Sequence, residues 1–159
     1  MDFIAKVNDQ IYFGKYPDED ILEALKELKV KLIIDLTHFT DNLPKYPSIK
    51  GIKRIEFPIV DMGIQEDDLT LQYVMFIKSL FLNGDNPIYI HCRGGHGRSG
   101  VITCLLYGML YDKTAEESLE AIKEAHDNRK QMSRRMRIIG SPQTPKQKLQ
   151  VIRLLSKEA

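Results

Sequence analysis

Apolar residues recur along the chain in two kinds of pattern. Apolar positions three and four apart form one face of a helix, whereas short continuous apolar runs are typical of buried strands. The expected helices cover residues 20–28, 69–82, 99–111, a segment that opens at Thr114, and 145–156. The expected strands cover residues 11–13, 30–36, 52–59 and 87–91. Strands that alternate with helices predict an α/β fold with a central, mostly parallel sheet flanked by helices.

Local signals refine these elements. Residues 37–51 hold two prolines and several turn formers, which predicts a loop. Thr114 and Glu117 have the spacing of a capping box at a helix start. The helix 99–111 is so apolar that it should be buried on all sides. In the helix 145–156, the side chains expected to face the core are those of Leu149, Ile152 and Leu155.

Length and composition exclude several classes of protein. The 159 residues contain no repeat or linker, so residues 1–159 are expected to form a single domain. The net charge of +1 indicates neither a nucleic-acid nor a membrane partner. No apolar run approaches the ~20 residues that a membrane span needs. The N-terminus has neither the basic nor the apolar region of a secretion signal.

The chain has two cysteines, Cys92 and Cys104. Cys104 lies at least one turn inside the helix 99–111, so a disulfide with Cys92 is not expected. Two unpaired thiols favour a reducing compartment, the cytoplasm or the nucleus.

Residues 91–100, HCRGGHGRSG, carry the strongest chemical signal. Cys92 comes directly after an expected strand and is followed by five residues, three of them glycine. A thiol at a helix N-terminus lies in positive potential, which favours the thiolate. Glycines let successive backbone N–H groups turn toward one anion. Arg98 adds a planar fork that matches two phosphate oxygens.

This arrangement predicts attack on phosphorus. Cys92 is the expected nucleophile, giving a phosphocysteine, and Arg98 is the expected phosphate clamp. Ser99 can donate a hydrogen bond to the thiolate, and His91 can support the loop. No metal is required, because Arg98 and the amides balance the phosphoryl charge. The expected phosphate-binding loop consists of Arg93, Gly94, Gly95, His96, Gly97 and Arg98.

The pattern H-C-x-x-x-x-x-R-S/T resembles the cysteine-dependent protein tyrosine phosphatase superfamily. It is most similar to the dual-specificity branch, including the cyclin-dependent-kinase-associated phosphatase type. The resemblance covers roughly residues 10–157. Upstream, FPIVDMGIQED resembles the mobile loop that carries the general acid. Downstream, SPQTPKQ resembles a water-positioning loop, which implies that Gln143 and Gln147 orient water.

Asp61 is the expected general acid and, in a second step, the base. It lies on the glycine-containing connection after the strand 52–59, which can overhang the end of a neighbouring parallel strand. Asp67 and Asp68 are alternatives for the acid, although both also suit a helix N-terminus.

Other candidate residues have competing interpretations. His91, Cys92 and His96 are too few to predict a metal site. Residues 129–137 are basic, and they form either a solvated helix end or a rim that attracts acidic or multiply phosphorylated substrates. Arg93 and His96 are expected to add positive potential near the phosphate. Asp35 can either line the cleft or serve as a hydrogen-bonding residue at a strand end, and it is left out of the predicted site. The pair Ile138–Ile139 is interpreted as packing.

Three functional hypotheses follow. The first is a protein phosphatase that acts on phosphotyrosine and on phosphoserine and phosphothreonine, with a phosphorylated protein as its partner. The second keeps the chemistry but takes an inositol phosphate, a phosphoinositide or an RNA 5′-phosphate. The third is a phospho-binding pseudo-phosphatase, which the presence of Cys92, Arg98 and Asp61 disfavours.

Overall fold

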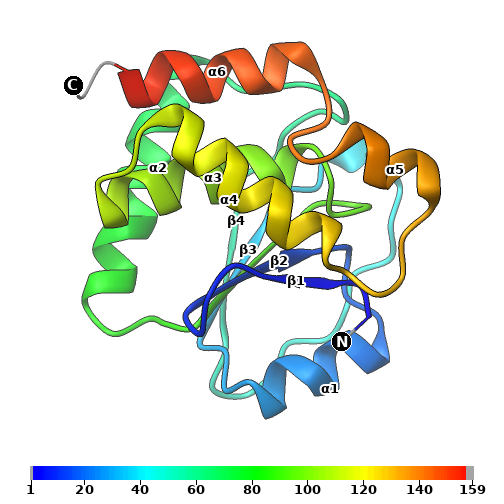
Figure 1. Cartoon of the computed structure of the whole chain (residues 1–159). Helices are drawn as coiled ribbons and strands as arrows, with labels where there is room; N and C mark the ends of the chain where they lie inside the picture. The colour runs from blue at the N-terminus through cyan, green and yellow to red at the C-terminus, as the bar shows by residue number, and fades with distance from the viewer. Residues whose placement is uncertain (1, 157–159) are drawn as a thin grey trace.

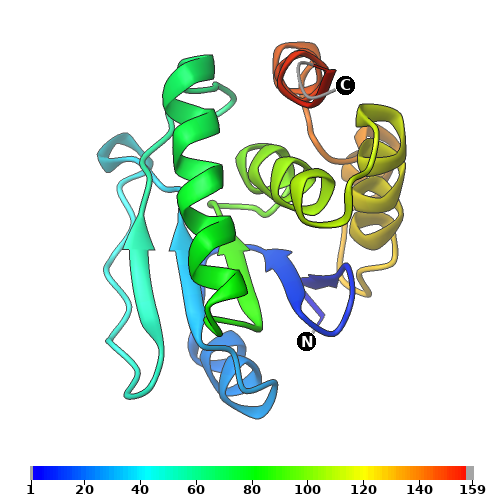
Figure 2. The same cartoon turned by 90° about the vertical axis from the view of Figure 1, so that its left-hand side faces the viewer.

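Five short strands form a single sheet in the computed structural model, which describes residues 2–156. In chain order they are β1 Ile4–Lys6, β2 Ile11–Gly14, β3 Leu32–Asp35, β4 Lys53–Glu56 and β5 Ile88–His91. Their order across the sheet is β1-β2-β5-β3-β4, with β1 antiparallel to β2 and the other pairs parallel. The prediction of a mostly parallel sheet is confirmed, and β5 lies at its centre (Figure 2).

Helices cover both faces of the sheet (Figure 1). They are α1 Glu19–Glu27, α2 Asp67–Leu82, α3 Arg98–Tyr111, α4 Ala115–Asp127, α5 Arg134–Ile139 and α6 Pro145–Ser156, with a 3₁₀ turn η1 Phe39–Asp41. Successive strand side chains point to opposite faces. Tyr12, Ile33 and Tyr89 therefore pack with α1, whereas their strand neighbours pack with α2, α3, α4 and α6.

The apolar helix α3 lies at the centre of the larger core, and its residues from Arg98 to Leu106 are all buried. This confirms the prediction of a buried helix except at its C-terminal end, where Tyr111 is 39% exposed. None of the helices within residues 2–156 is long and apolar enough to span a bilayer. The segment between β5 and α3 follows the carboxyl end of the central strand, where α/β sheets bind ligands.

Two sequence predictions are only partly right. The strand predicted over 52–59 is present but covers only Lys53–Glu56. Pro58 has no N–H to donate to a strand ladder, although the N–H groups of Phe57 and Ile59 still donate to the carbonyls of Asp35 and Leu36. Leu149 and Ile152 are 52% and 41% exposed, whereas Leu155 is buried as predicted. The buried face of α6 consists of Gln147, Gln150, Val151, Leu154 and Leu155. This face is rotated from the predicted one because its two glutamines donate to backbone carbonyls of neighbouring loops.

Three elements have no strong sequence pattern. β1 is three residues long, η1 is a single turn, and α5 has no buried residue. Ile138 on α5 is 73% exposed, so its interpretation as packing is wrong. Short elements of this kind are fixed by tertiary contacts rather than by periodicity.

Candidate active site

The thiol of Cys92 lies at the start of α3, almost fully buried. The backbone N–H of Gly95 donates to Cys92 Sγ at 3.3 Å, and Ser99 Oγ lies 3.3 Å from the same sulfur. Gly95 and Ser99 thus place two hydrogen-bonding groups on the sulfur.

The tight path of the segment 92–98, called the phosphate loop below, depends on Gly95. Gly95 has a φ of +78°, which L side chains rarely adopt. A Cβ at this position would lie 2.3 Å from the carbonyl carbon of Gly14 at the end of β2. A larger residue would therefore push the phosphate loop away from the sheet.

Arg98 is held by two acidic residues from different loops. Its Nη1 and Nη2 donate to Asp41 Oδ2 and Oδ1 at 2.8 and 3.0 Å, and Nη1 also donates to the carbonyl of Ile59 at 2.8 Å. Asp61 Oδ1 lies 3.2 Å from Nη2. Nε of Arg98 is buried and has no hydrogen-bond partner within residues 2–156. The guanidinium is thus fixed from one side, while its Nε donor remains available.

Asp41 on η1 was missed by the sequence analysis, because the loop 37–51 has no periodic pattern. Burial alone would raise the pKa of Asp41, but hydrogen bonds from Arg98 and from the His38 N–H, together with the charge of Arg98, hold the pKa below its usual value. Asp41 is therefore ionised at neutral pH and forms a buried ion pair with Arg98.

Replacing Asp41 with asparagine is expected to lower the free energy of unfolding at pH 7 by about 3 kcal/mol. The substitution leaves the Arg98 charge buried without its carboxylate, and breaking one side of a buried pair costs several kcal/mol. Because the folded-state pKa of Asp41 is lowered, its contribution is present above the unfolded pKa of about 4 and is lost as the pH falls through the folded value. Urea denaturation between pH 7 and pH 3 measures this difference.

Asp9→Asn is the matched control, since Asp9 is 84% exposed in its pair with Lys6. Its loss is expected to leave the free energy of unfolding nearly unchanged, because an exposed ion pair contributes little to stability. Equal effects of the two substitutions would contradict a structural role for the Asp41–Arg98 pair.

Of the three candidate acids, only Asp61 contacts Arg98. It is 56% exposed and lies on the loop that leaves β4. Asp67 and Asp68 instead occupy the first turn of α2, and Asp67 pairs with Arg153 at 2.9 Å. The interpretation of Asp67 and Asp68 as helix N-terminal charges is therefore confirmed.

His91 connects the nucleophile to a buried polar network. Its Nδ1 lies 3.2 Å from the carbonyl oxygen of Cys92, and its Nε2 lies 2.8 Å from the hydroxyl of Tyr46. Burial lowers the pKa of His91 to about 4, so the ring is neutral. Arg54 donates to both Tyr46 and Asp35. Asp35, which was left out of the predicted site, is thus part of the network that supports His91. Its Oδ1 lies 3.8 Å from His91 Nε2.

Arg129 supports the phosphate loop from behind. It is 4% exposed and donates to the carbonyl oxygens of Gly95 and Gly94 at 2.8 and 3.3 Å. Arg137 in turn donates to the carbonyl of Arg129 at 3.1 Å. Carbonyls turned toward Arg129 leave the N–H groups of the loop free to face an anion. Neither sequence interpretation of residues 129–137 identified this contact.

Three other basic residues of this segment lie on the surface of the protein. Lys130, Arg134 and Arg135 are exposed, and the sequence between residues 128 and 156 contains no acidic residue. Burial, Arg129 and His126 lower the pKa of His96 to about 4. The expectation that His96 adds positive charge to the free site at neutral pH is therefore wrong.

Gln147 joins the phosphate loop to the loop that carries Asp61. It is fully buried, accepts from the N–H groups of Gln143 and Thr144, and donates to the carbonyl of Gly63 at 3.2 Å. A Cβ on Gly97 would lie 2.8 Å from Gln147 Oε1, so this side chain also contacts the phosphate loop. Gln147 therefore has a closer connection to the site than Gln143.

Residues 10–151 match the family model described as "PTP-SAK: Swiss Army Knife protein, DSP-PTPase phosphatase domain". The chain belongs to this phosphatase family. Its curated relatives include "Putative tyrosine phosphatase 197R" of Invertebrate iridescent virus 6, which is 31% identical over 74% of the chain and 46% of the viral protein. The phosphatase domain spans about half the length of the curated relatives it matches.

Solved structures share the fold of this phosphatase domain. The active form of Tk-PTP has a TM-score of 0.77 and 19% identity, covering 98% of this chain and 97% of Tk-PTP. Kinase associated phosphatase has a TM-score of 0.66 and 19% identity, covering 92% of this chain and 86% of that protein. These likenesses confirm the tyrosine and dual-specificity phosphatase fold, in which the kinase-associated type is one of several similar structures.

Proposed function

We propose that this phosphatase domain hydrolyses phosphotyrosine and also phosphoserine and phosphothreonine monoesters of proteins, through a phosphocysteine intermediate. The observation that carries the proposal is that three groups meet at the phosphate loop. The loop itself holds the Cys92 thiol and the Arg98 guanidinium, and the Asp61 carboxylate reaches Arg98 from the loop after β4. A nucleophile, a phosphate clamp and a proton donor are the groups that the reaction needs.

Arg98 suits the clamp because of how its five N–H groups are used. Asp41 and the Ile59 carbonyl orient the guanidinium from one side, and Nε lacks a protein partner in the described chain. A phosphoryl group would take Nε and the Nη2 position beside Asp61. Two parallel hydrogen bonds to one planar group fix the orientation of the phosphate as well as its position.

In the first step the Cys92 thiolate attacks phosphorus, an S–P bond forms, and the P–O bond to the leaving group breaks. Protonated Asp61 gives its proton to the leaving oxygen. In the second step a water attacks the phosphocysteine and gives its proton to the Asp61 carboxylate. The S–P bond breaks, inorganic phosphate leaves, and the Ser99 hydroxyl donates a hydrogen bond to the restored thiolate.

Asp61→Asn is expected to lower kcat/KM about 100-fold for phosphate esters with poor leaving groups. For esters with good leaving groups, kcat/KM should change little. An asparagine cannot protonate the leaving oxygen, and only a basic leaving group needs that proton. A series of aryl phosphates of increasing phenol pKa measures the dependence. Asp68→Asn is the control, because Asp68 is an exposed residue of α2. A uniform loss across the series would contradict Asp61 as the acid.

The substrate has a second candidate class. The exposed cations Lys130, Arg134 and Arg135 belong to the basic segment 129–137, in which Arg129 donates to the phosphate loop and Arg137 donates to Arg129. No acidic residue lies among them. Such a basic rim favours polyanions, for which inositol phosphates, phosphoinositides and RNA 5′-phosphates are the candidates. Because the nucleophile is a thiol, we assign the protein to a reducing compartment, the cytoplasm or the nucleus.

A phosphate-release screen over phosphopeptides, inositol phosphates, phosphoinositides and RNA 5′-ends tests the substrate class, with Cys92→Ser as the blank. The proposal expects phosphopeptides to be hydrolysed with the highest kcat/KM. Strong turnover of a polyanion with little on phosphopeptides would favour the second class. Tight phosphopeptide binding without turnover of any ester would instead indicate a pseudo-phosphatase.

A further inference from the structure

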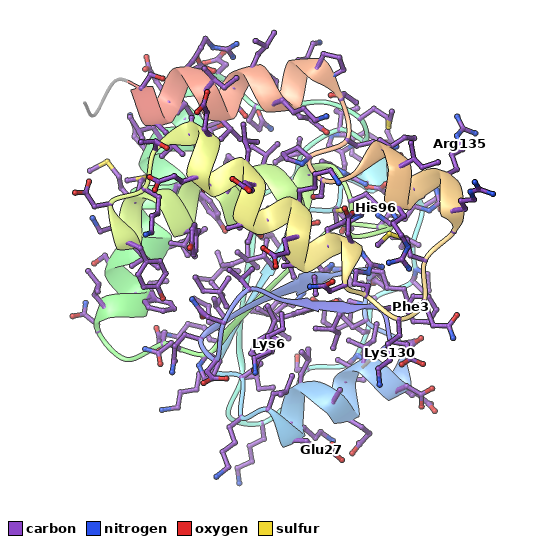
Figure 3. The ribbon with its side chains drawn as sticks, viewed as in Figure 1. Phe3, Lys6, Glu27, His96, Lys130 and Arg135 are labelled. Atoms are coloured by element: carbon purple, nitrogen blue, oxygen red, sulfur yellow. The ribbon has the colours of Figure 1, made fainter. Side chains whose placement is uncertain are left out.

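A chain of three hydrogen-bonded side chains leads from the phosphate loop into α4. His96 Nδ1 lies 2.7 Å from His126 Nε2, and His126 Nδ1 lies 2.9 Å from Asp127 Oδ1. His126 is fully buried, and the two rings meet edge to face at 5.0 Å between centroids. His96 comes from the loop after β5 and lies beside α4 (Figure 3).

The partners fix which nitrogens carry protons. Burial alone would raise the pKa of Asp127, but Lys123 and His126 hold it below the usual value, so Asp127 is an ionised acceptor. His126 Nδ1 must therefore carry the proton that faces Asp127. In the neutral ring His126 Nε2 is then an acceptor, which requires the proton on His96 Nδ1. The remaining nitrogen, His96 Nε2, has a free lone pair.

One added proton changes this pair from neutral to cationic. The proton binds His96 Nε2, which becomes a donor, and the charge is shared with His126 and stabilised by Asp127. This edge of His96 lies against the phosphate loop, since a Cβ on Gly94 would be 2.9 Å from its Cδ2 and 3.3 Å from its Nε2. The added charge would thus appear at the loop itself.

The surrounding charges oppose protonation in the free protein. Burial, Arg129 and His126 lower the pKa of His96, and burial, Arg129 and Lys123 lower that of His126, against the effect of Asp127. On the loop side Arg98 and Arg93 are further cations near the anion site. The negative charge of a dianion bound among these cations offsets their repulsion of an added proton, which favours the protonated form of the His96–His126 pair.

We propose that the His96–His126 pair takes up a proton when a phosphate-like dianion binds in the phosphate loop. His96 is then a positioning residue that turns a donor toward the loop only when the anion is present. The inference rests on the proposed function only in requiring that the loop binds a phosphate-like anion, and it does not require turnover. By linkage, a site that takes up a proton on binding has higher affinity at lower pH.

Calorimetric titration of the Cys92→Ser protein with sulfate tests this directly. Sulfate stays a dianion and the substituted chain has no loop thiol, so neither contributes protons. At pH 6, in two buffers of different ionisation enthalpy, the observed enthalpy should differ by an amount that corresponds to uptake of up to about one proton per sulfate. The dissociation constant should rise by up to about tenfold per pH unit above pH 5.

Two further substitutions in the Cys92→Ser protein assign the proton. His126→Asn should reduce the uptake and flatten the pH dependence, because His96 then no longer shares the added charge with His126 and Asp127. Asp127→Asn keeps an oxygen that accepts from His126 but removes the charge, so it should reduce the uptake while leaving the fold intact. Glu124→Gln is the matched control, since it removes one exposed acidic charge from the same helix and should leave the uptake unchanged.

The outcomes separate this inference from the proposed function. Sulfate binding with unchanged uptake in both His126→Asn and Asp127→Asn would overturn the inference and leave the anion site intact. Should His126→Asn fail to fold, unchanged uptake in Asp127→Asn alone would overturn it. Sulfate binding without any uptake in the parent Cys92→Ser protein would do the same. Absence of sulfate binding in that parent would overturn the anion site and the proposed function together.

Discussion

Cys92→Ser is expected to lower kcat for an aryl phosphate by about four orders of magnitude or more, with phosphate esters still bound. A serine hydroxyl stays protonated at neutral pH, and the groups on Cys92 Sγ are hydrogen-bond donors such as the Gly95 N–H rather than a general base. Arg98 and the loop amides remain in place, so binding should be preserved. Steady-state kinetics and calorimetric binding of the same phosphopeptide give the two quantities.

Cys104→Ser is the matched control for this result. Cys104 is fully buried inside α3, and burial raises the pKa of its thiol, which keeps it protonated. Cys104→Ser should leave kcat nearly unchanged and act only on stability. Comparable losses of activity in the two variants would contradict the assignment of Cys92 as nucleophile.

Arg98→Lys is expected to lower kcat/KM by about 1000-fold. Lysine keeps the charge that Asp41 needs, so the chain should still fold, but it lacks the planar fork that holds two phosphate oxygens. Loss of one preorganised group that stabilises transition-state charge costs about 100-fold to 1000-fold in rate. Kinetics with a single aryl phosphate, together with urea denaturation, separates the catalytic effect from a folding defect.

Arg129→Lys provides the comparison for Arg98→Lys. Arg129 supports the loop through the carbonyls of Gly94 and Gly95, on the side away from the anion-facing N–H groups. Its replacement should therefore cost less than that of Arg98. An Arg98→Lys effect no larger than that of Arg129→Lys would show that Arg98 does not clamp the phosphate.

The centre of the site could be predicted from sequence because its parts are contiguous. Cys92, the glycines and Arg98 lie within seven residues between a strand and a helix that are both strongly apolar. The strand–loop–helix order alone brings the thiol to a helix N-terminus. Asp61 could be predicted because parallel strands end at one edge of the sheet, so the loop after β4 reaches the loop after β5.

The supporting residues could not be predicted because their partners are far away in sequence. Asp41 lies in a loop without periodicity, and nothing local indicates that its carboxylate meets Arg98. Arg129 is one of five basic residues within positions 129–137, and only the tertiary structure distinguishes the buried one from its exposed neighbours. Asp35 has the appearance of a strand end, since its role depends on Arg54 from β4 and on His91 from β5.

The face of α6 was predicted wrongly for a related reason. Apolar spacing favoured Leu149 and Ile152 as inward residues, but Gln147 and Gln150 take inward positions and donate to the carbonyls of Gly63 and Gln65. Buried glutamines are stable where both ends of the amide have partners. Periodicity counts only apolar residues, so it cannot detect a helix face that is rotated to satisfy polar bonds.

The central claim is that a phosphoryl group passes through Cys92. Rapid-quench mass spectrometry of the Asp61→Asn protein with an aryl phosphate of low leaving-group pKa tests it most directly. The first step then needs no proton donor, while the second step lacks its base, so the covalent intermediate should accumulate. The account predicts about one phosphate per chain on Cys92. Release of the phenol with no phosphorylated residue, or with the phosphate on another side chain such as His96, would contradict it.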